Sequence, residues 1–358
     1  MSPLAVLLPT LLAATVDVAP GEDLRVAVAS TRPGDTIRLS AGTHAGTLGR
    51  IRTGVHVVGA GVGETVIRAP EGEDGAVVEA GGDLRLEALT LKASGPRSAI
   101  RVLGGEVRAN GISLVGGAVG AFVGGGRLAL ADADLSGEYG VLLQSGELTL
   151  EGSRVRGKRA GVAQIGGAAR LGRVVVTGPA AEAGVTISGG IASLTDVVLR
   201  TPGPSGLSVL GRSRVEARAI DVSGALPEGG FLGDCVQVSR GAVVLDGAVL
   251  TRCGGAALEA FGGSIEARGV DATGGDAGCL VFLERASGRL QGNVCTRRGP
   301  AVVAASGAQV TASMNRWSTD PVLWVECGTG ARVHLGAGER TREPCRNPGS
   351  SLDKPLRK

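Results

Sequence analysis

Aromatic residues are nearly absent from this chain of 358 residues. It holds two Trp, one Tyr and four Phe, and its charged residues leave a formal net charge of only +3. Proteins that bind nucleic acid combine strong positive charge with aromatic side chains on which bases stack. The composition therefore argues against a nucleic-acid partner and gives no case for an anionic membrane surface.

Histidine is also scarce, and no cysteine stands in a Cys-x-x-Cys pair. His44 and His56 lie near one end of the chain and His334 near the other, so they cannot share a triad or a metal site unless the chain folds back on itself. The glycine-rich segment 59–65 lacks the lysine of a phosphate-binding loop and leads into a strand pattern. We expect no metal and no cofactor.

No apolar run is long enough to cross a membrane. The run Leu4–Ala14 has the length of the apolar core of a secretory signal peptide, which predicts cleavage near Ala14 and a secreted or cell-surface protein. Because no Lys or Arg precedes this run, an apolar first strand or cap is the alternative.

Glycine is abundant. The chain has 62 Gly and 15 Pro, without the period of three of collagen and with too many aliphatic residues for a disordered chain. Glycine is also costly inside helices. The aliphatic side chains must build a core almost without rings, which suits many short repeated units.

An internal repeat follows the glycines. Twelve units succeed one another at intervals of 20 to 23 residues, with one interval of 29, beginning at Gly75, Ser98, Gly120, Gly140, Gly161, Gly184, Gly206, Cys235, Gly255, Gly278, Pro300 and Pro321. Each unit has three strand-length runs separated by glycine-containing corners. This predicts an all-β, single-stranded parallel β-helix of about twelve coils. A leucine-rich repeat would need an Asn or Cys ladder, and a propeller blade about twice the period.

The segment before the repeats predicts a short helix over Glu22–Thr31, followed by a turn and a strand over Arg32–Leu39. The first coils follow, with the segments Gly42-Thr-His44, Gly54–Gly61 and Gly63–Ile67. A helix across the open end is a common way to cap a solenoid. This order is similar to the N-terminal cap and first coils of the pectate-lyase-like superfamily, which pectin methylesterases and many uncharacterised β-helix repeat proteins share. The resemblance covers about residues 20–70, and it implies right-handed winding.

No catalytic residue carries over from the superfamily. Gly42-Thr-His-Ala-Gly46 stands where pectin methylesterases have Gly-x-Tyr-x-Glu, and Leu171-Gly-Arg-Val-Val175 lacks their Pro-Trp. The paired aspartates, the Arg-x-Pro-x-x-Arg segment of pectate lyases, and the Asp-Asp and Gly-His-Gly segments of polygalacturonases are missing too. We predict an exported, non-catalytic scaffold that binds a protein or glycan. The alternative that the superfamily implies is a polysaccharide-acting lyase, hydrolase or epimerase.

The first strand of each unit is where this superfamily usually binds substrate. Its third and fifth residues are mostly apolar or small, and include Leu142, Phe282 and Leu323. Only Glu79 and Glu259 are charged; they lie eight coils apart, roughly 38 Å at about 4.8 Å per coil, and cannot act on one bond. This predicts an exposed apolar stripe for a partner, unless a register error exchanges inward and outward positions. The second strand reads as an ordinary solvated face.

The one long unit carries an insertion around residues 225–234. Functional sites favour such loops. If the chain has a ligand site, we expect it to include Glu228, Phe231, Asp234, Glu259, Phe261 and Glu284. The simpler alternative is a loop that covers apolar surface.

The six cysteines lie in the last part of the chain, at Cys235, Cys253, Cys279, Cys295, Cys327 and Cys345. An even number in an exported protein indicates disulfides. Because residues one period apart stack at one strand spacing, we predict pairing in sequence order, with the first bond linking adjacent coils. The last bond would hold the basic tail against the final coil.

The predicted organisation has four parts. They are a signal peptide over 1–14, a cap with the first coils over 15–74, β-helix repeats over 75–338 and a basic tail over 339–358.

Overall fold

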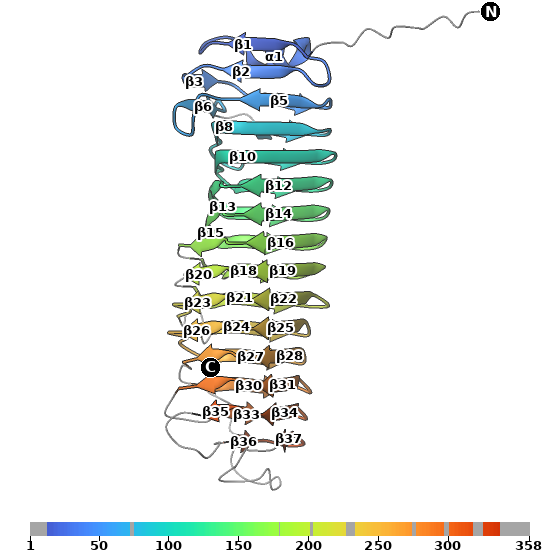
Figure 1. The fold of residues 1–358 in the computed structure, drawn as a ribbon, viewed down its shortest axis with the longest axis vertical. Helices are drawn as coiled ribbons and strands as arrows, with labels where there is room; N and C mark the ends of the chain where they lie inside the picture. Colours follow the sequence, from blue (N-terminus) through green and yellow to red (C-terminus); the bar gives the residue numbers. More distant parts are fainter. Residues whose placement is uncertain are drawn as a thin grey trace, which may run out of the picture.

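The computed structural model describes residues 13–71, 75–178, 180–200, 203–226, 233–273, 277–296, 301–317 and 325–336. The chain winds into a parallel β-solenoid of about 13 turns with one short helix at its N-terminal end (Figure 1). This confirms the predicted all-β parallel β-helix with a helical cap. The structure has slightly more turns than the twelve counted repeats because strands before Gly75 form turns of their own.

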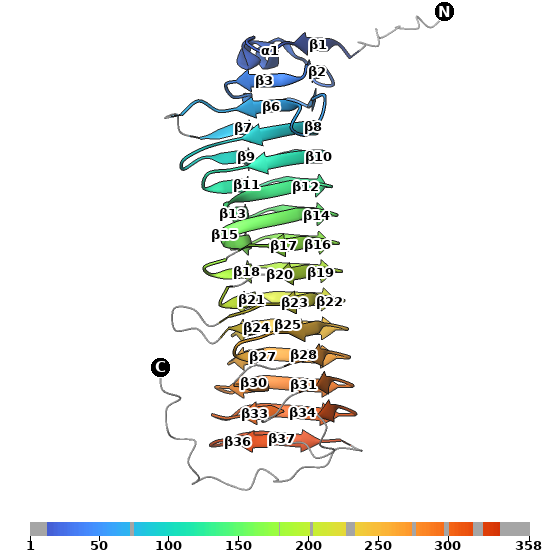
Figure 2. The same ribbon diagram turned by 90° about the vertical axis from the view of Figure 1, so that its left-hand side faces the viewer.

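Three strands follow one another in most turns, and strands of each kind stack along the solenoid (Figure 2). The strands that open the repeats form the first-strand face: β4 (Gly49–Ile51), β7 (Ala76–Ala80), β9 (Ser98–Val102), β11 (Val119–Val123), the later parts of β13 (Asp134–Leu143) and β15 (Arg154–Gln164), β18 (Ala183–Ile187), β21 (Ser205–Leu210), β24 (Asp234–Ser239), β27 (Ala256–Phe261), β30 (Gly278–Leu283), β33 (Val302–Ala304) and β36 (Val325–Cys327).

The second-strand face consists of β1 (Thr15–Val18), β2 (Thr36–Leu39), β5 (Val55–Val58), the early parts of β8 (Leu84–Lys92) and β10 (Glu106–Val115), β12 (Arg127–Ala131), β14 (Glu147–Glu151), β16 (Ala168–Gly172), β19 (Ile191–Thr195), β22 (Arg214–Arg218), β25 (Ala242–Asp246), β28 (Ser264–Arg268), β31 (Ser287–Gln291), β34 (Gln309–Ser313) and β37 (Arg332–Leu335).

The third-strand face consists of β3 (Gly42–Ala45), β6 (Thr65–Arg68), the remaining parts of β8, β10, β13 and β15, and β17 (Val175–Thr177), β20 (Val198–Arg200), β23 (Asp221–Ser223), β26 (Val249–Thr251), β29 (Asp271–Ala272), β32 (Val294–Cys295) and β35 (Arg316–Trp317).

The corner between the second and third strands turns at one residue with positive φ. Glycine takes this position in some turns, for example Gly152 and Gly247, where the missing Cβ makes the conformation easy. Elsewhere a residue with a side chain takes it, as at Asp132, Arg173 and Asp196, with φ between 49° and 54°. The corner is therefore fixed by the stacking of the turns and does not depend on glycine alone.

The helix α1 (Leu24–Ser30) begins close to the predicted position. Asp23 caps it, with its carboxylate accepting a hydrogen bond from the Arg25 backbone N–H at 2.8 Å. Leu24 and Ala27 are buried against the first turns, so the helix protects the N-terminal end of the core.

Side chains in the interior compensate one another in size from turn to turn. The buried Phe282 of β30 packs against Gly288 of β31, where an added Cβ would lie 2.7 Å from the ring. The counterparts of Phe282 in the neighbouring turns are alanines, and those of Gly288 are Ile265 and Val310. Each of these three layers thus pairs a large side chain with a small one.

The prediction of an exposed apolar stripe is wrong at Phe282, which is buried. The register makes Val281 the outward neighbour of Glu259, and Leu280 and Phe282 point into the core with at most 2% exposure. The units that begin at Ser98 and Pro300 show the same error. A shift of one residue exchanges the two faces of a strand. Leu142 is half-buried, and Leu323 lies outside the described residues.

Two of the predicted disulfides are present. Cys235 pairs with Cys253 and Cys279 with Cys295, with Cα–Cα distances of 5.2 and 6.3 Å. Both bonds tie the first strand of a turn to the end of that same turn, so the expectation that the first would link adjacent coils is wrong. Cys327 is also disulfide-bonded, and its predicted partner Cys345 lies outside the described residues.

The predicted signal peptide lies almost wholly outside the described residues, as does the tail over 339–358. Both stay predictions, and so do the boundaries 15–74 and 75–338. Within the part of the chain that the structure describes, no helix combines the length and the apolar character needed to span a membrane.

The pairing of Phe282 with Gly288 predicts a compensating double substitution. Gly288→Val should destabilise the protein by about 1–3 kcal/mol or more through overpacking, and Phe282→Ala by about 3–5 kcal/mol through a cavity. Together the two substitutions recreate the Ala304 and Val310 pair of the next turn. We therefore expect the double variant to lose clearly less stability than the sum of the losses in the two single variants. Chemical unfolding of the four proteins measures this, and strictly additive losses would contradict the packing described.

Candidate functional site

Two columns of side chains face outward from the first-strand face. In the first column, described side chains on successive turns are Arg50, Glu79, Arg101, Phe122, Leu142, Ala163, Thr186, Ser208, Gln237, Glu259, Val281 and Val303. The second column lies two residues further along each strand and carries the exposed apolar side chains Leu103, Ile165 and Phe261. The half-buried Leu210 belongs to the same column, and Gly, Gln and Ser residues separate these apolar side chains, so the apolar surface is interrupted.

The N-terminal part of the first column is charged. Glu79 lies between two arginines, with Arg50 Nε at 3.4 Å and Arg101 Nη1 at 3.8 Å from its carboxylate. The Arg101 guanidinium lies over the Phe122 ring, 5.4 Å from its centroid. The sequence predicts Glu79 as an outward charge but not its arginine partners, because the register expected from the sequence places Arg101 in the interior.

The middle of the same column is polar on four consecutive turns. Thr186 and Ser208 are neighbours across one strand spacing, Gln237 follows on the next turn and Glu259 on the one after. The Gln237 amide Nε2 donates to Glu259 Oε2 at 3.1 Å. These four residues are called the polar row below.

The structure brings some of the predicted site residues together. Asp234 begins β24, and Glu259 lies on β27 of the next turn. Phe261, on the same strand as Glu259, is 37% exposed. Glu284 lies in the turn after β30 with a φ of 49°, and no hydrogen bond or ion pair among the described residues joins it to the other carboxylates. Glu228 and Phe231 lie outside the described residues.

Three depressions lie along the second-strand face, which the sequence did not single out. Their lining residues come from the turns of β5 to β14 and of β22 to β34. No group of three or more His, Cys, Asp or Glu side chains suited to a metal ion occurs among the described residues.

Asp234 and Glu259 form a carboxyl pair at the end of the polar row. Asp234 is only 3% exposed, and its Oδ1 accepts a hydrogen bond from the Ala256 backbone N–H at 2.6 Å. Glu259 is half-buried and is held from the other side by Gln237. The pair thus joins two successive turns of the solenoid next to the insertion.

The pKa of Asp234 is raised to about 8, mainly by burial and also by the negative charge of Glu259 and a hydrogen bond with it, against the lowering effect of the Ala256 N–H. Asp234 therefore carries a proton at neutral pH. A buried neutral carboxyl can donate a hydrogen bond to the neighbouring carboxylate, which fixes Glu259 in place.

The raised pKa of Asp234 predicts a stability that falls with pH. Above its ordinary pKa of 3.8, the unfolded chain has lost a proton that the folded protein keeps up to about pH 8. We expect the wild type to lose on the order of 6 kcal/mol relative to Asp234→Asn between these two values, since one pKa unit is worth about 1.4 kcal/mol. Unfolding curves across this pH range measure the difference.

The exposed Asp246→Asn provides the control and should follow the wild type. Glu259→Gln should give an intermediate pH dependence, because it removes the charge of Glu259 but leaves the burial of Asp234. If Asp234→Asn ran parallel to the wild type at every pH, Asp234 would not hold its proton in the folded protein.

Several solved structures are similar to this one. No known protein-family model and no curated protein matches the sequence. The Dettilon tailspike protein is 12% identical at a TM-score of 0.48, with 87% of this chain and 64% of that chain covered. The A-module of the Azotobacter vinelandii mannuronan C-5 epimerase AlgE6 is 15% identical (TM-score 0.40; 90% and 96% covered), and the pectate lyase Pel9A is 9% identical (TM-score 0.40; 94% and 82% covered).

This chain therefore spans less than two thirds of the tailspike. At such low identity the similarity concerns the fold, and it assigns no ligand or activity to this chain.

Proposed function

We propose that this chain is an extracytoplasmic β-helix that binds a glycan along its first-strand face without transforming it. The polar row of Thr186, Ser208, Gln237 and Glu259 is the observation that carries the proposal. Its accessible polar groups are the Gln237 amide and the Glu259 carboxylate, which lie on adjacent turns about 4.8 Å apart. Ser208 is only 7% exposed, and Thr186 Oγ1 is buried without a hydrogen-bond partner among the described residues. A linear polymer of hydroxyl-rich rings that lies along the solenoid axis can hydrogen-bond to both accessible groups.

The flanks of the row suit the same class of ligand. Ile165 and Phe261 lie in the neighbouring outward column and are 55% and 37% exposed. Sugar rings combine polar edges with apolar C–H faces, and side chains of both kinds side by side can contact them. The described part of the face has few aromatic rings, so we expect affinity to come from many weak contacts along the chain.

The disulfides support a location outside the cytoplasm. Two are formed within single turns near the C-terminal part of the solenoid, and Cys327 is also disulfide-bonded. Disulfides persist in oxidising compartments and are rare in the cytosol. Export by the segment 1–14 is part of the proposal.

A binding role is favoured over catalysis by the geometry of the carboxyl pair. Glycosidases place their two carboxyl groups about 5–9.5 Å apart, on either side of the bond they cleave. Asp234 is only 3% exposed, so it cannot stand opposite Glu259 across a bond of a bound polysaccharide. Asp234 would thus position Glu259 for hydrogen bonding to the ligand.

The same pair is also what favours the second candidate, a polysaccharide-acting lyase, hydrolase or epimerase. A protonated carboxyl next to an ionised one can provide an acid and a base. Glu259 is accessible enough to touch a substrate. In that case Asp234 would serve as its proton reservoir.

The binding proposal predicts a loss of affinity when the polar row is shortened. Secreted, non-reduced protein is tested on an array of neutral and acidic glycans, and affinities are then measured by calorimetry. Gln237→Ala and Glu259→Gln should each weaken binding by about tenfold, because a hydrogen bond to a charged or buried partner is worth about 1.5 kcal/mol. Ser193→Ala, on the second-strand face, should bind as the wild type does. Unchanged affinity in both row variants would overturn the assignment to this face.

A degradation screen separates binding from catalysis. The protein is incubated with acidic and neutral polysaccharides, with and without Ca²⁺, and assayed for unsaturated and reducing ends and for epimerised residues. We expect no product. Product formation that disappears in Glu259→Gln and in Asp234→Asn would establish the enzyme instead.

A further inference from the structure

A separate feature lies on the second-strand face, away from the polar row. Strand β12 has alanines at two outward positions, Ala129 and Ala131, between turns with larger side chains. The preceding strand β10 places Arg108 and Asn110 at the matching positions, and the following strand β14 places Thr149 and Glu151 there. The short alanine side chains leave a depression of about 390 Å³.

The walls of this depression carry hydrogen-bonding groups on both sides. Asn110 and Arg108 lie towards the N-terminal end, and Thr149 and Glu151 towards the C-terminal end. The two walls are two strand spacings apart, roughly 10 Å. A six-membered sugar ring fits this width, with a C–H face on the alanine floor and its hydroxyls directed to the walls.

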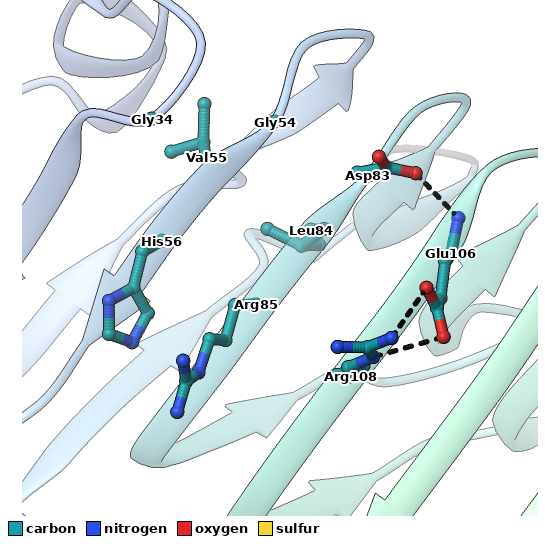
Figure 3. Close-up of a pocket in the computed structure, with 9 residues that line it drawn as sticks. All are labelled: Gly34, Gly54, Val55, His56, Asp83, Leu84, Arg85, Glu106 and Arg108. Carbon is teal, nitrogen blue, oxygen red and sulfur yellow. Dashed lines mark hydrogen bonds and ion pairs between the residues drawn. The ribbon is translucent and has the colours of Figure 1, made fainter.

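The charged groups of the walls are already paired and therefore oriented. Arg108 binds Glu106 through two hydrogen bonds of 3.0 and 2.9 Å, which Figure 3 shows as dashed lines. On the preceding turn, Arg85 Nη2 lies 2.6 Å from Glu87 Oε1. Each guanidinium keeps N–H groups that its carboxylate does not use. These can donate to a ligand without breaking the ion pair.

The depression continues along the axis into a second one. The neighbouring hollow of about 330 Å³ shares Arg85 and Arg108 with the first and extends to His56 and Gly34 (Figure 3). Together they form one groove across the turns of β5, β8, β10, β12 and β14. A ligand in it would be several rings long and would run parallel to the solenoid axis.

The charge balance of the groove points to a neutral ligand. Glu87 compensates Arg85, Glu106 compensates Arg108, and Glu151 is paired with Arg173 at 2.9 Å. The remaining carboxylate of the lining, Asp83, accepts a hydrogen bond from the Glu106 backbone N–H at 2.9 Å. An anionic ligand would have to compete with these carboxylates for the arginines, whereas neutral hydroxyls can accept from the N–H groups and donate to the carboxylates. We propose that this groove is a second binding site, specific for a neutral oligosaccharide. It is independent of the site proposed on the first-strand face.

The test uses the full chain with its disulfides intact. Neutral gluco-, manno-, galacto- and xylo-oligosaccharides and an acidic oligogalacturonate are screened by saturation-transfer NMR, and hits are measured by calorimetry. Ala131→Phe fills the floor and should weaken binding of a neutral oligosaccharide by about tenfold or more. Ala168→Phe adds the same ring at an outward position on β16 outside the groove, and should bind as the wild type does.

Two further variants keep the test decisive if a bulky ring disturbs the fold. Asn110→Ala and Thr149→Ala remove one polar group from each wall without adding volume, and each should weaken the same interaction severalfold. Gln237→Ala, in the polar row, should leave it unchanged, which separates this site from the first-strand face. The proposal is overturned if no neutral oligosaccharide binds at millimolar concentration, if only the acidic probe binds, or if the groove variants bind as well as Ala168→Phe.

Discussion

The parallel register between successive turns is the constraint on which the rest of this structure depends. Each strand pairs with its counterpart one repeat later, so every side chain has a fixed neighbour above and below at about 4.8 Å. In the interior this forces volumes to balance within a layer, as Phe282 and Gly288 show. On the outside it arranges side chains in columns, and a column is a natural contact surface for a linear ligand.

The carboxyl pair follows from this register together with one local offset. Gln237 and Glu259 are direct neighbours, whereas Asp234 begins its strand three residues before Gln237 and reaches the next turn through the Ala256 N–H. Its side chain is enclosed where the insertion joins the first strand. The long unit is therefore the place where the regular column gains a buried titratable group.

The sequence was sufficient for the solenoid, its cap and two of the disulfides, because each depends on a repeat length or on nearest neighbours along the period. It was harder to predict which residues of each strand face the core and which face the solvent. In the unit of Phe282, both Leu280 and Val281 are apolar, so alternation cannot tell inside from outside, and the true register becomes clear only from the packing of Phe282 over Gly288. Asp234 and Glu259 are both predicted site residues, but their contact is not predictable from their spacing in the sequence. The depression over Ala129 and Ala131 depends on the size of residues two turns apart.

The solenoid itself does not need a carboxyl group at position 234. The counterparts one turn before and one turn after are Ser205 and Ala256, and both are accommodated in the same stack. A carboxyl with a pKa of about 8 lowers the stability of the folded state at neutral pH, whereas Ser or Ala would not. Its effect on its surroundings is to hold Glu259 in one orientation at the end of the polar row. A group that weakens the fold while it orders an accessible carboxylate is better explained by what that carboxylate binds than by the architecture.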